Sequence, residues 1–211
     1  MQKIKLLFLI VISMIIFTAC GNKYSVENLK KDDKLLKETV LKCKEKHDEK
    51  ICKNVEQAQN ELALEAWNKV KPEIKTRLDR IAKAMEAGDF MAGMSEVPEK
   101  YFKYQADKAS ISVEQLKEMS KKMFDNFTKG VKITQNSYDF ENVKVGRTET
   151  GRSYAIIPTT VAMEVNGQAI ETKGKSMAFE DENKWYIINF DKDFIFFIKG
   201  VYPDLAEVKV D

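Results

Sequence analysis

The hydrophobic period of the chain changes at Gly130, and this change constrains the fold more than any other feature. Before it, apolar residues recur every three or four positions, as in amphipathic helices. Four strand candidates follow it: 131–145, 154–165, 168–179 and 185–190. These runs alternate apolar with polar positions and are rich in β-branched and aromatic residues. The sequence therefore predicts an α+β chain in which helices come first and an antiparallel sheet follows.

Turn signals set the order of the strands. Asn166-Gly167 is the dipeptide typical of a type I′ hairpin turn, and the polar triplet 181–183 marks the next reversal. At least three strands should therefore form a meander. Residues 194–198 are almost wholly aromatic or branched, and exposing them would invite aggregation. We expect this tail to pack as a further strand or against the helices.

Helix boundaries are also readable. Pro72 is placed to open a new helix, because its missing N–H is harmless in the first turn, and Gly88 is placed to end that helix. Residues 89–110 should be irregular or a short helix with clustered aromatic residues. Ser112 and Gln115 have the spacing of a capping box. The helix that they open has an apolar face: Leu116, Met119, Met123, Phe124 and Phe127.

The N-terminus has the layout of a signal peptide. Lys3 and Lys5 precede the apolar run 6–17, and two small residues lead into Cys20. A membrane-spanning helix needs about 20 apolar residues, whereas the apolar part of a signal peptide has roughly 7–15. A permanent anchor helix is therefore the minor alternative.

Residues 17–20, Phe-Thr-Ala-Cys, resemble the lipobox of bacterial lipoproteins. The resemblance implies that residues 1–19 are removed as a signal peptide and that Cys20 becomes the first residue of the mature chain. It also implies that the Cys20 thiol carries a diacylglyceryl group, with acyl chains such as palmitate. Two or more acyl chains give stable anchoring. An ordinary secretory signal with a cysteine at the cleavage point is the alternative.

Residues 20–33 are polar and lysine-rich, and we expect them to be a lipidated tether on the periplasmic side of the bacterial envelope. Gly21 and Asn22 follow the cysteine, with no Asp there. By resemblance to enterobacterial lipoproteins, this favours the outer membrane over the inner membrane.

Once Cys20 is lipidated, an even pair of cysteines remains in an oxidising compartment, Cys43 and Cys52, and we expect a disulfide between them. Residues 34–70 have two helical stretches with a charged break between them. A helical hairpin would bring the two cysteines together. A closed loop of about ten residues gives the bridge roughly 2.5–3 kcal/mol of stabilisation from loop-closure entropy.

His47, the one histidine of the sequence, lies between these cysteines and could suggest a metal site. Structural zinc takes four closed ligands, and neither a fourth cysteine nor a second histidine exists. We therefore expect a solvated His47 and no metal.

The charge of the mature chain is balanced. The formal net charge is +2, but removing Lys3 and Lys5 leaves 33 basic side chains (35 minus 2) against 33 acidic ones. Binding to nucleic acid through counterion release needs a basic excess. We therefore expect no nucleic-acid partner.

The order of elements in residues 72–211 resembles the nuclear transport factor two superfamily, including SnoaL-like domains. The similarity lies in 87–90 (Ala-Gly-Asp-Phe), in 98–104, and in 183–188 (Asn-Lys-Trp-Tyr-Ile-Ile). It implies a cone-shaped domain of two or three helices packed on a curved antiparallel sheet, with a pocket at the open end. Aromatic residues are the candidates to line it: Phe90, Tyr101, Phe124, Tyr154 and Trp185. Packing in the core is the alternative role for most of them.

A second resemblance covers residues 24–62. The segments 24–29 (Tyr-Ser-Val-Glu-Asn-Leu), 41–44 (Leu-Lys-Cys-Lys) and 51–58 (Ile-Cys-Lys-Asn-Val-Glu-Gln-Ala) are similar to the entry-exclusion lipoproteins of conjugative elements. Those proteins are short, so the long C-terminal half departs from their pattern. The resemblance implies a role in entry exclusion or the reuse of a hairpin module.

For function, we expect a non-catalytic binding module that recognises an envelope protein or a small hydrophobic ligand, without a cofactor. No Ser/His/Asp set, Cys/His nucleophile pair or Gly-rich phosphate loop is present. A cone-fold enzyme is the second alternative to this module, after entry exclusion. It would need a pocket carboxylate such as Asp89, Glu164 or Glu171. The oligomeric state is left open by the sequence.

Overall fold

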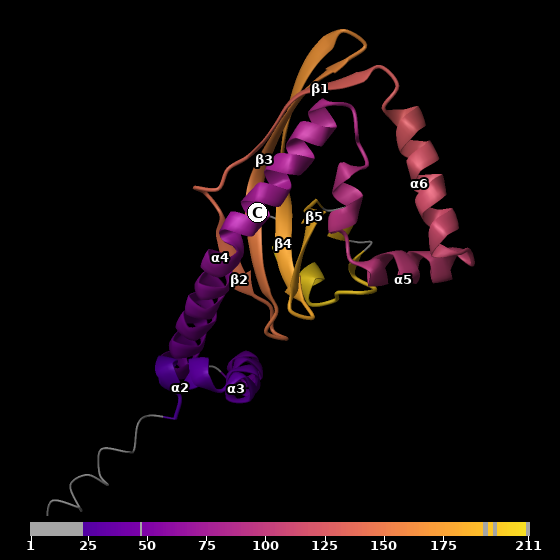
Figure 1. The fold of residues 1–211 in the computed structure, drawn as a ribbon. Coiled ribbons are helices and arrows are strands. Elements are labelled where there is room, and N and C mark those ends of the chain that lie inside the picture. Colours follow the sequence, from indigo (N-terminus) through magenta and orange to yellow (C-terminus); the bar gives the residue numbers. More distant parts are fainter. Residues whose placement is uncertain (1–22, 47, 192–193, 196–197, 210–211) are drawn as a thin grey trace, which may run out of the picture. The chain divides into compact units, whose positions relative to one another are not determined.

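The computed structural model describes residues 23–46, 48–191, 194–195 and 198–209 (Figure 1). The helices are α2 (Val26–Lys31), α3 (Asp33–Glu45), α4 (Glu49–Glu86), α5 (Glu99–Ala109) and α6 (Val113–Phe127), with the 3₁₀ helices η1 (Ala92–Glu96) and η2 (Leu205–Glu207). The strands are β1 (Val131–Tyr138), β2 (Lys144–Arg147), β3 (Ser153–Val165), β4 (Gln168–Asp181) and β5 (Lys184–Asn189). The chain divides into two compact units, Met1–Glu61 and Leu62–Asp211. The α+β class is confirmed.

The described part of the first unit is helical. Its core contains side chains from all three helical segments: Leu29, Leu36, Thr39, Val40, Val55 and Ala58. Each helix begins at a capping side chain. Ser25 accepts the Asn28 N–H at 3.3 Å, Asp32 accepts the Leu35 N–H at 2.9 Å, and Asp48 opens α4 in the same way.

The predicted disulfide is present. Cys43 near the end of α3 and Cys52 in the first turn of α4 are bonded, with their Cα atoms 5.6 Å apart. The two cysteines flank the charged break between the helices, as the hairpin interpretation requires. Cys20 and His47 lie outside the described residues, as does the predicted signal peptide 1–19.

The described part of residues 20–33, which we expected to be a tether, contains helix. Helix α2 occupies Val26–Lys31, and α3 begins at Asp33. Leu29 is completely buried, and the Asn54 amide donates to the Tyr24 carbonyl at 2.9 Å. The burial of Leu29 and the Asn54 hydrogen bond hold this polar segment in place. The lysine-rich composition did not indicate either contact.

Pro72 does not open a new helix, because α4 runs through it to Glu86. A proline inside a helix removes one N–H and clashes with the carbonyl four residues earlier. Here Asn68 and Pro72 are both exposed, so water can solvate the carbonyl that lacks a donor. Buried residues on both sides of the proline, such as Trp67 and Ile74, pack in the core and stabilise the helix before and after it.

The second unit is built around a curled antiparallel sheet in the order β1-β3-β4-β5, with β2 also paired to β3 (Figure 1). The turn at Asn166-Gly167 is confirmed, since both residues have positive φ (51° and 82°) and Val165 pairs with Gln168. The reversal between β4 and β5 is also confirmed.

The predicted strand 131–145 is two strands. β1 ends at Tyr138, and β2 begins at Lys144. The Asp139 carboxylate accepts the N–H groups of Glu141 and Asn142 at 3.0 and 3.1 Å, which folds the chain into a turn. Local side-chain bonding therefore interrupts a pattern that alternates in the sequence.

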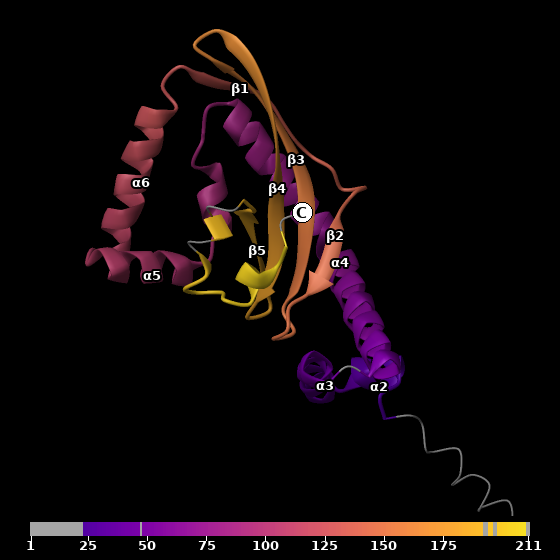
Figure 2. The ribbon, with the colours of Figure 1, turned by 180° about the vertical axis from the view of Figure 1, so that it is seen from behind.

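Both faces of the sheet are covered within the second unit (Figure 2). Ala155, Ile157 and Ala178 pack with α4 on one face. The neighbouring residues Ile156 and Met177 pack on the other face, since successive side chains alternate. That second face is covered by the C-terminal segment, with Phe190, Ile198, Tyr202 and Leu205. The described residues of the tail, Phe194, Ile195 and Ile198, are helical and pack there.

Candidate functional site

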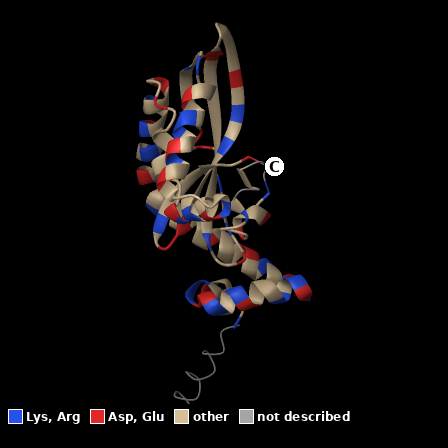
Figure 3. Cartoon of the chain, turned by 90° about the vertical axis from the view of Figure 1, so that its right-hand side faces the viewer, with Lys and Arg blue, Asp and Glu red and all other residues tan. Residues whose placement is uncertain are grey.

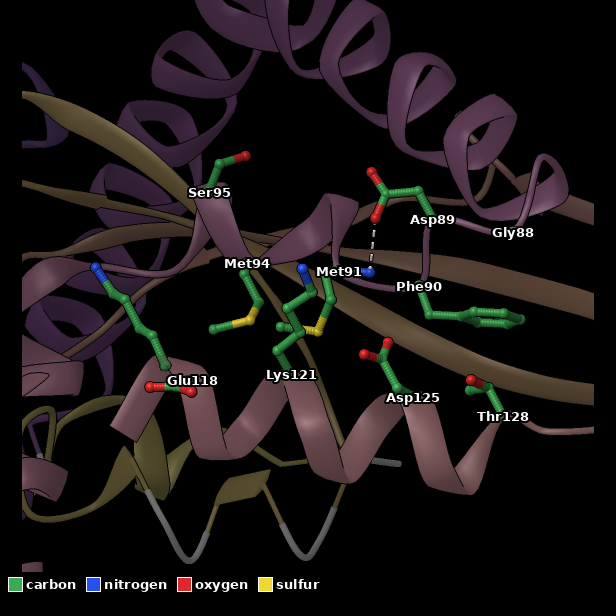
Figure 4. Close-up of a pocket in the computed structure, with 11 residues that line it drawn as sticks. Gly88, Asp89, Phe90, Met91, Met94, Ser95, Glu118, Lys121, Asp125 and Thr128 are labelled. Carbon is green, nitrogen blue, oxygen red and sulfur yellow. Dashed lines mark hydrogen bonds between the residues drawn. The ribbon is translucent and has the colours of Figure 1, made fainter. Parts of the chain in front are cut away.

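The candidate site is a groove between the segment that follows α4 and helix α6, with a volume of about 760 Å³. We call it the η1–α6 groove. Its lining comes from these two segments alone: Gly88, Asp89, Phe90, Met91, Met94 and Ser95 on one side, and Lys117, Glu118, Lys121, Asp125 and Thr128 on the other. Figure 4 shows that Met91 and Met94 point toward α6 and that Lys121 and Asp125 point toward η1, whereas Asp89 and Ser95 turn away from α6.

The η1 wall is shaped by the end of α4. Gly88 has φ +93° and donates its N–H to the Met85 carbonyl, while the Asp89 N–H bonds to the Ala84 carbonyl. This glycine cap turns the chain out of the helix. Asp89 then accepts the Met91 N–H at 3.1 Å, which starts the 3₁₀ turn.

The η1 wall is apolar. Residues three apart eclipse one another in a 3₁₀ helix, so Met91 and Met94 present their thioethers on the same side. Both are half-buried and line the groove together with Phe90 (Figure 4). Methionine is flexible and polarisable, so such a wall can adapt to apolar ligands of different shape.

The α6 wall is polar and charged. The predicted capping box is confirmed, with Ser112 accepting the Gln115 N–H and the Gln115 side chain accepting the Ser112 N–H. Lys121 and Asp125 point from α6 toward η1 (Figure 4). From Glu118 to Thr128 the wall spans ten residue-to-residue steps, which is about 15 Å at 1.5 Å per residue.

Some of these charges are already paired. Lys117 donates to Glu99 at 3.0 Å, and Glu118 bonds to Lys122 at 2.8 Å. The pKa of Glu118 is lowered, chiefly by its hydrogen bond with Lys122. Over the described ranges, Lys121 and Asp125 form no ion pair.

The surface of α6 outside the groove lining includes exposed apolar residues. Met119, Met123 and Phe124 keep 59%, 62% and 41% of their surface accessible. The helix thus presents its charged side to the groove and leaves its apolar side without cover from the part of the chain that is described.

A second pocket, of about 770 Å³, lies between α4 and the β4–β5 turn and includes Trp185. One of its charged groups, Arg77, is held in place. The buried Glu96, next to the lining residue Ser95, accepts hydrogen bonds from Arg77 and from Arg80, and Arg77 also donates to the Trp185 carbonyl at 2.9 Å. These compensated charges favour a structural role for Arg77.

The structure does not gather the five predicted pocket residues in one place. Phe90 lines the η1–α6 groove, whereas Trp185 lines the second pocket and packs near Trp67. Tyr101 and Tyr154 are half-buried against the core on the C-terminal side of the sheet. Phe124 is exposed on α6, outside the groove lining.

Of the three candidate carboxylates, Asp89 lies in the η1–α6 groove. Glu164 and Glu171 are exposed on the hairpin formed by β3 and β4. The groove residues missed by sequence reasoning are Met91, Met94, Lys121 and Asp125. The Met-x-x-Met spacing directly after Gly88 is a signal that could have indicated the apolar wall.

Comparisons with known proteins return no match to any protein family, curated protein or solved structure. Among the described residues, no helix is both long and apolar enough to cross a membrane. Nor does that part of the chain contain a cluster of three or more His, Cys, Asp or Glu side chains suited to a metal ion.

Proposed function

We propose that the chain is a lipid-anchored envelope lipoprotein that binds a small ligand with an apolar part in the η1–α6 groove, without catalysing a reaction. The observation that carries this proposal is the wall of Phe90, Met91 and Met94 opposite a charged helix face. Concave sites with apolar walls and a few polar groups are the usual form of ligand pockets. Acidic and basic residues alternate along the ribbon in Figure 3, so neither sign of charge alone would recruit a partner.

The anchor in this proposal is Cys20, which follows the apolar run 6–17. Its test is Cys20→Ala. Metabolic labelling with palmitate should be lost, and the protein should leave the membrane fraction. Labelling that persists in the variant would refute lipidation at this residue.

For the second unit we propose the cone-shaped fold of the nuclear transport factor two superfamily. Helix α4 packs along one face of a curled antiparallel sheet, and the groove lies beyond its last turn. This arrangement is in keeping with a pocket at the open end of a cone.

Entry exclusion is a second candidate function. The resemblance to entry-exclusion lipoproteins covers residues 24–62, and the first compact unit ends at Glu61. The resemblance therefore ends at the boundary of this compact unit. This agreement supports the interpretation of the first unit as a separate module that evolved independently of the second unit. In a mating assay, cells that express the protein should be poor recipients, and unchanged recipient efficiency would exclude this role.

A dye titration tests the groove. A neutral apolar fluorescent probe such as phenylnaphthylamine should bind the mature chain. Replacing both Met91 and Met94 with Ser should weaken binding about tenfold, since roughly two methylene-sized contacts are lost. The matched control replaces Met119 and Met123 on the other side of α6. Equal losses in both double variants would show that the dye does not select the groove.

A further inference from the structure

The charges of the η1–α6 groove identify the class of ligand, which deepens the proposed function and rests on it. Five titratable side chains line the groove: Asp89, Lys117, Glu118, Lys121 and Asp125. Lys117 and Glu118 are satisfied by partners at 3.0 and 2.8 Å, Glu99 and Lys122 respectively.

Two of the other charges are available to a ligand. Lys121 and Asp125 form no ion pair with any described residue. In Figure 4 both side chains point from α6 toward the η1 wall, whereas the Asp89 carboxylate turns away from α6 and accepts the Met91 N–H at 3.1 Å. The groove therefore offers one ammonium group and one carboxylate beside an apolar wall.

We propose that the ligand is a zwitterionic single-chain amphiphile, with an ammonium and a phosphate group at one end, as in lysophosphatidylethanolamine. Lys121 binds the phosphate, and Asp125 binds the ammonium group. The acyl chain lies on Phe90, Met91 and Met94.

Charge complementarity selects this class over simpler amphiphiles. A purely anionic head would lie beside the Asp125 carboxylate, and a purely cationic head would lie beside the Lys121 ammonium group. Lys121 and Asp125 are four residues apart, about 6 Å along the helix axis, so one short headgroup can reach both. The α6 wall of about 15 Å gives the groove the elongated form that a single acyl chain needs.

Calorimetric titration tests the proposal on the full mature chain with Cys20→Ser, so that no lipid of its own competes for the groove. Three probes share one acyl chain and are used below their micelle concentrations: lysophosphatidylethanolamine, lysophosphatidylglycerol and a monoacylglycerol. Lysophosphatidylethanolamine should bind about fivefold more tightly than the other two probes. This factor corresponds to the upper end of the free energy that a solvent-exposed ion pair contributes. Lys121→Gln and Asp125→Asn should each abolish this preference. Lys129→Gln and Asp107→Asn are exposed controls outside the groove and should keep it.

The possible outcomes distinguish a wrong choice of ligand from a wrong proposed function. Equal affinity for the three probes, or tighter binding of lysophosphatidylglycerol, would overturn the zwitterionic ligand while leaving an apolar groove. Binding of none of them would overturn the proposed function as well. Unchanged tryptophan emission confirms that each variant is folded, since Trp67 is buried on α4 and Trp185 packs against the same core cluster.

Discussion

Removing the Arg152 guanidinium should destabilise the second unit more than any surface change. Arg152 donates to the Glu180 carbonyl and to Asp181, both at 2.7 Å, and to Asp204 at 2.9 Å. The side chains of Arg152, Asp181 and Asp204 are only 18%, 9% and 7% exposed. Arg152→Met would therefore leave two buried carboxylates without their shared cation.

Breaking a buried ion pair from one side costs about 3–5 kcal/mol. The lower end applies here because Lys100 still pairs with Asp181 at 2.5 Å, and Thr148 and Thr150 still donate to Asp204. We expect a loss of about 3 kcal/mol at pH 7. With a urea dependence of about 2 kcal/mol per molar, the unfolding midpoint should fall by about 1.5 M.

The loss should depend on pH. Burial by itself would raise the pKa of both Asp181 and Asp204, but hydrogen bonds outweigh it and lower both values: those from Lys100 and Arg152 for Asp181, and those from Thr150, Thr148 and Arg152 for Asp204. A carboxylate with a lowered folded-state pKa stabilises the fold above its unfolded value, about 4, and this contribution disappears as the pH falls through the folded value. The difference between wild type and Arg152→Met should therefore shrink as the pH falls below about 4.

Tryptophan fluorescence during urea unfolding is the appropriate assay, because both tryptophans belong to this unit: Trp67 is buried in its core and Trp185 packs against that core. Lys103→Met, at an exposed position on α5, is the control and should change stability by less than about 0.5 kcal/mol. A midpoint for Arg152→Met that matches this control, or a loss that is the same at pH 7 and pH 3, would refute the reasoning.

Two further predictions follow from the helices. Pro72→Ala should stabilise the second unit by about 1–3 kcal/mol, since it restores an N–H to the middle of α4. Circular dichroism during thermal unfolding measures the change in stability. An unchanged or lower melting midpoint would contradict the prediction. Thiol titration of the unreduced protein should find neither Cys43 nor Cys52 free, and replacing both with Ser should cost the first unit about 2.5–3 kcal/mol. Two titratable thiols at these positions would exclude the bridge.

Local signals in the sequence predicted the parts of the fold that depend on neighbouring residues. The hairpin at Asn166-Gly167, the capping box at Ser112 and the glycine cap at Gly88 each rest on a few adjacent side chains, and all three are confirmed. The pairing of Cys43 with Cys52 followed from a short loop between two helical patterns, and it is confirmed as well.

The features that the sequence misrepresented depend on distant contacts. Pro72 stays inside α4 because packing on either side of it outweighs its local cost. Helix α2 forms in a lysine-rich segment because one leucine, Leu29, is buried. The groove was missed because the period of α6 indicates an apolar face but does not indicate which segment that helix packs near. In the structure, the charged residues Lys121 and Asp125 face η1, and the apolar residues do not.

The most direct test of ligand binding in the η1–α6 groove is methyl NMR of the methionine side chains. Met91 and Met94 line the groove, whereas Met119 and Met123 lie on the exposed apolar side of α6. On titration with a monoacylglycerol, the methyl signals of Met91 and Met94 should shift and saturate together, while those of Met119 and Met123 stay in place. Shifts confined to Met119 and Met123, or no shifts at all, would contradict the account.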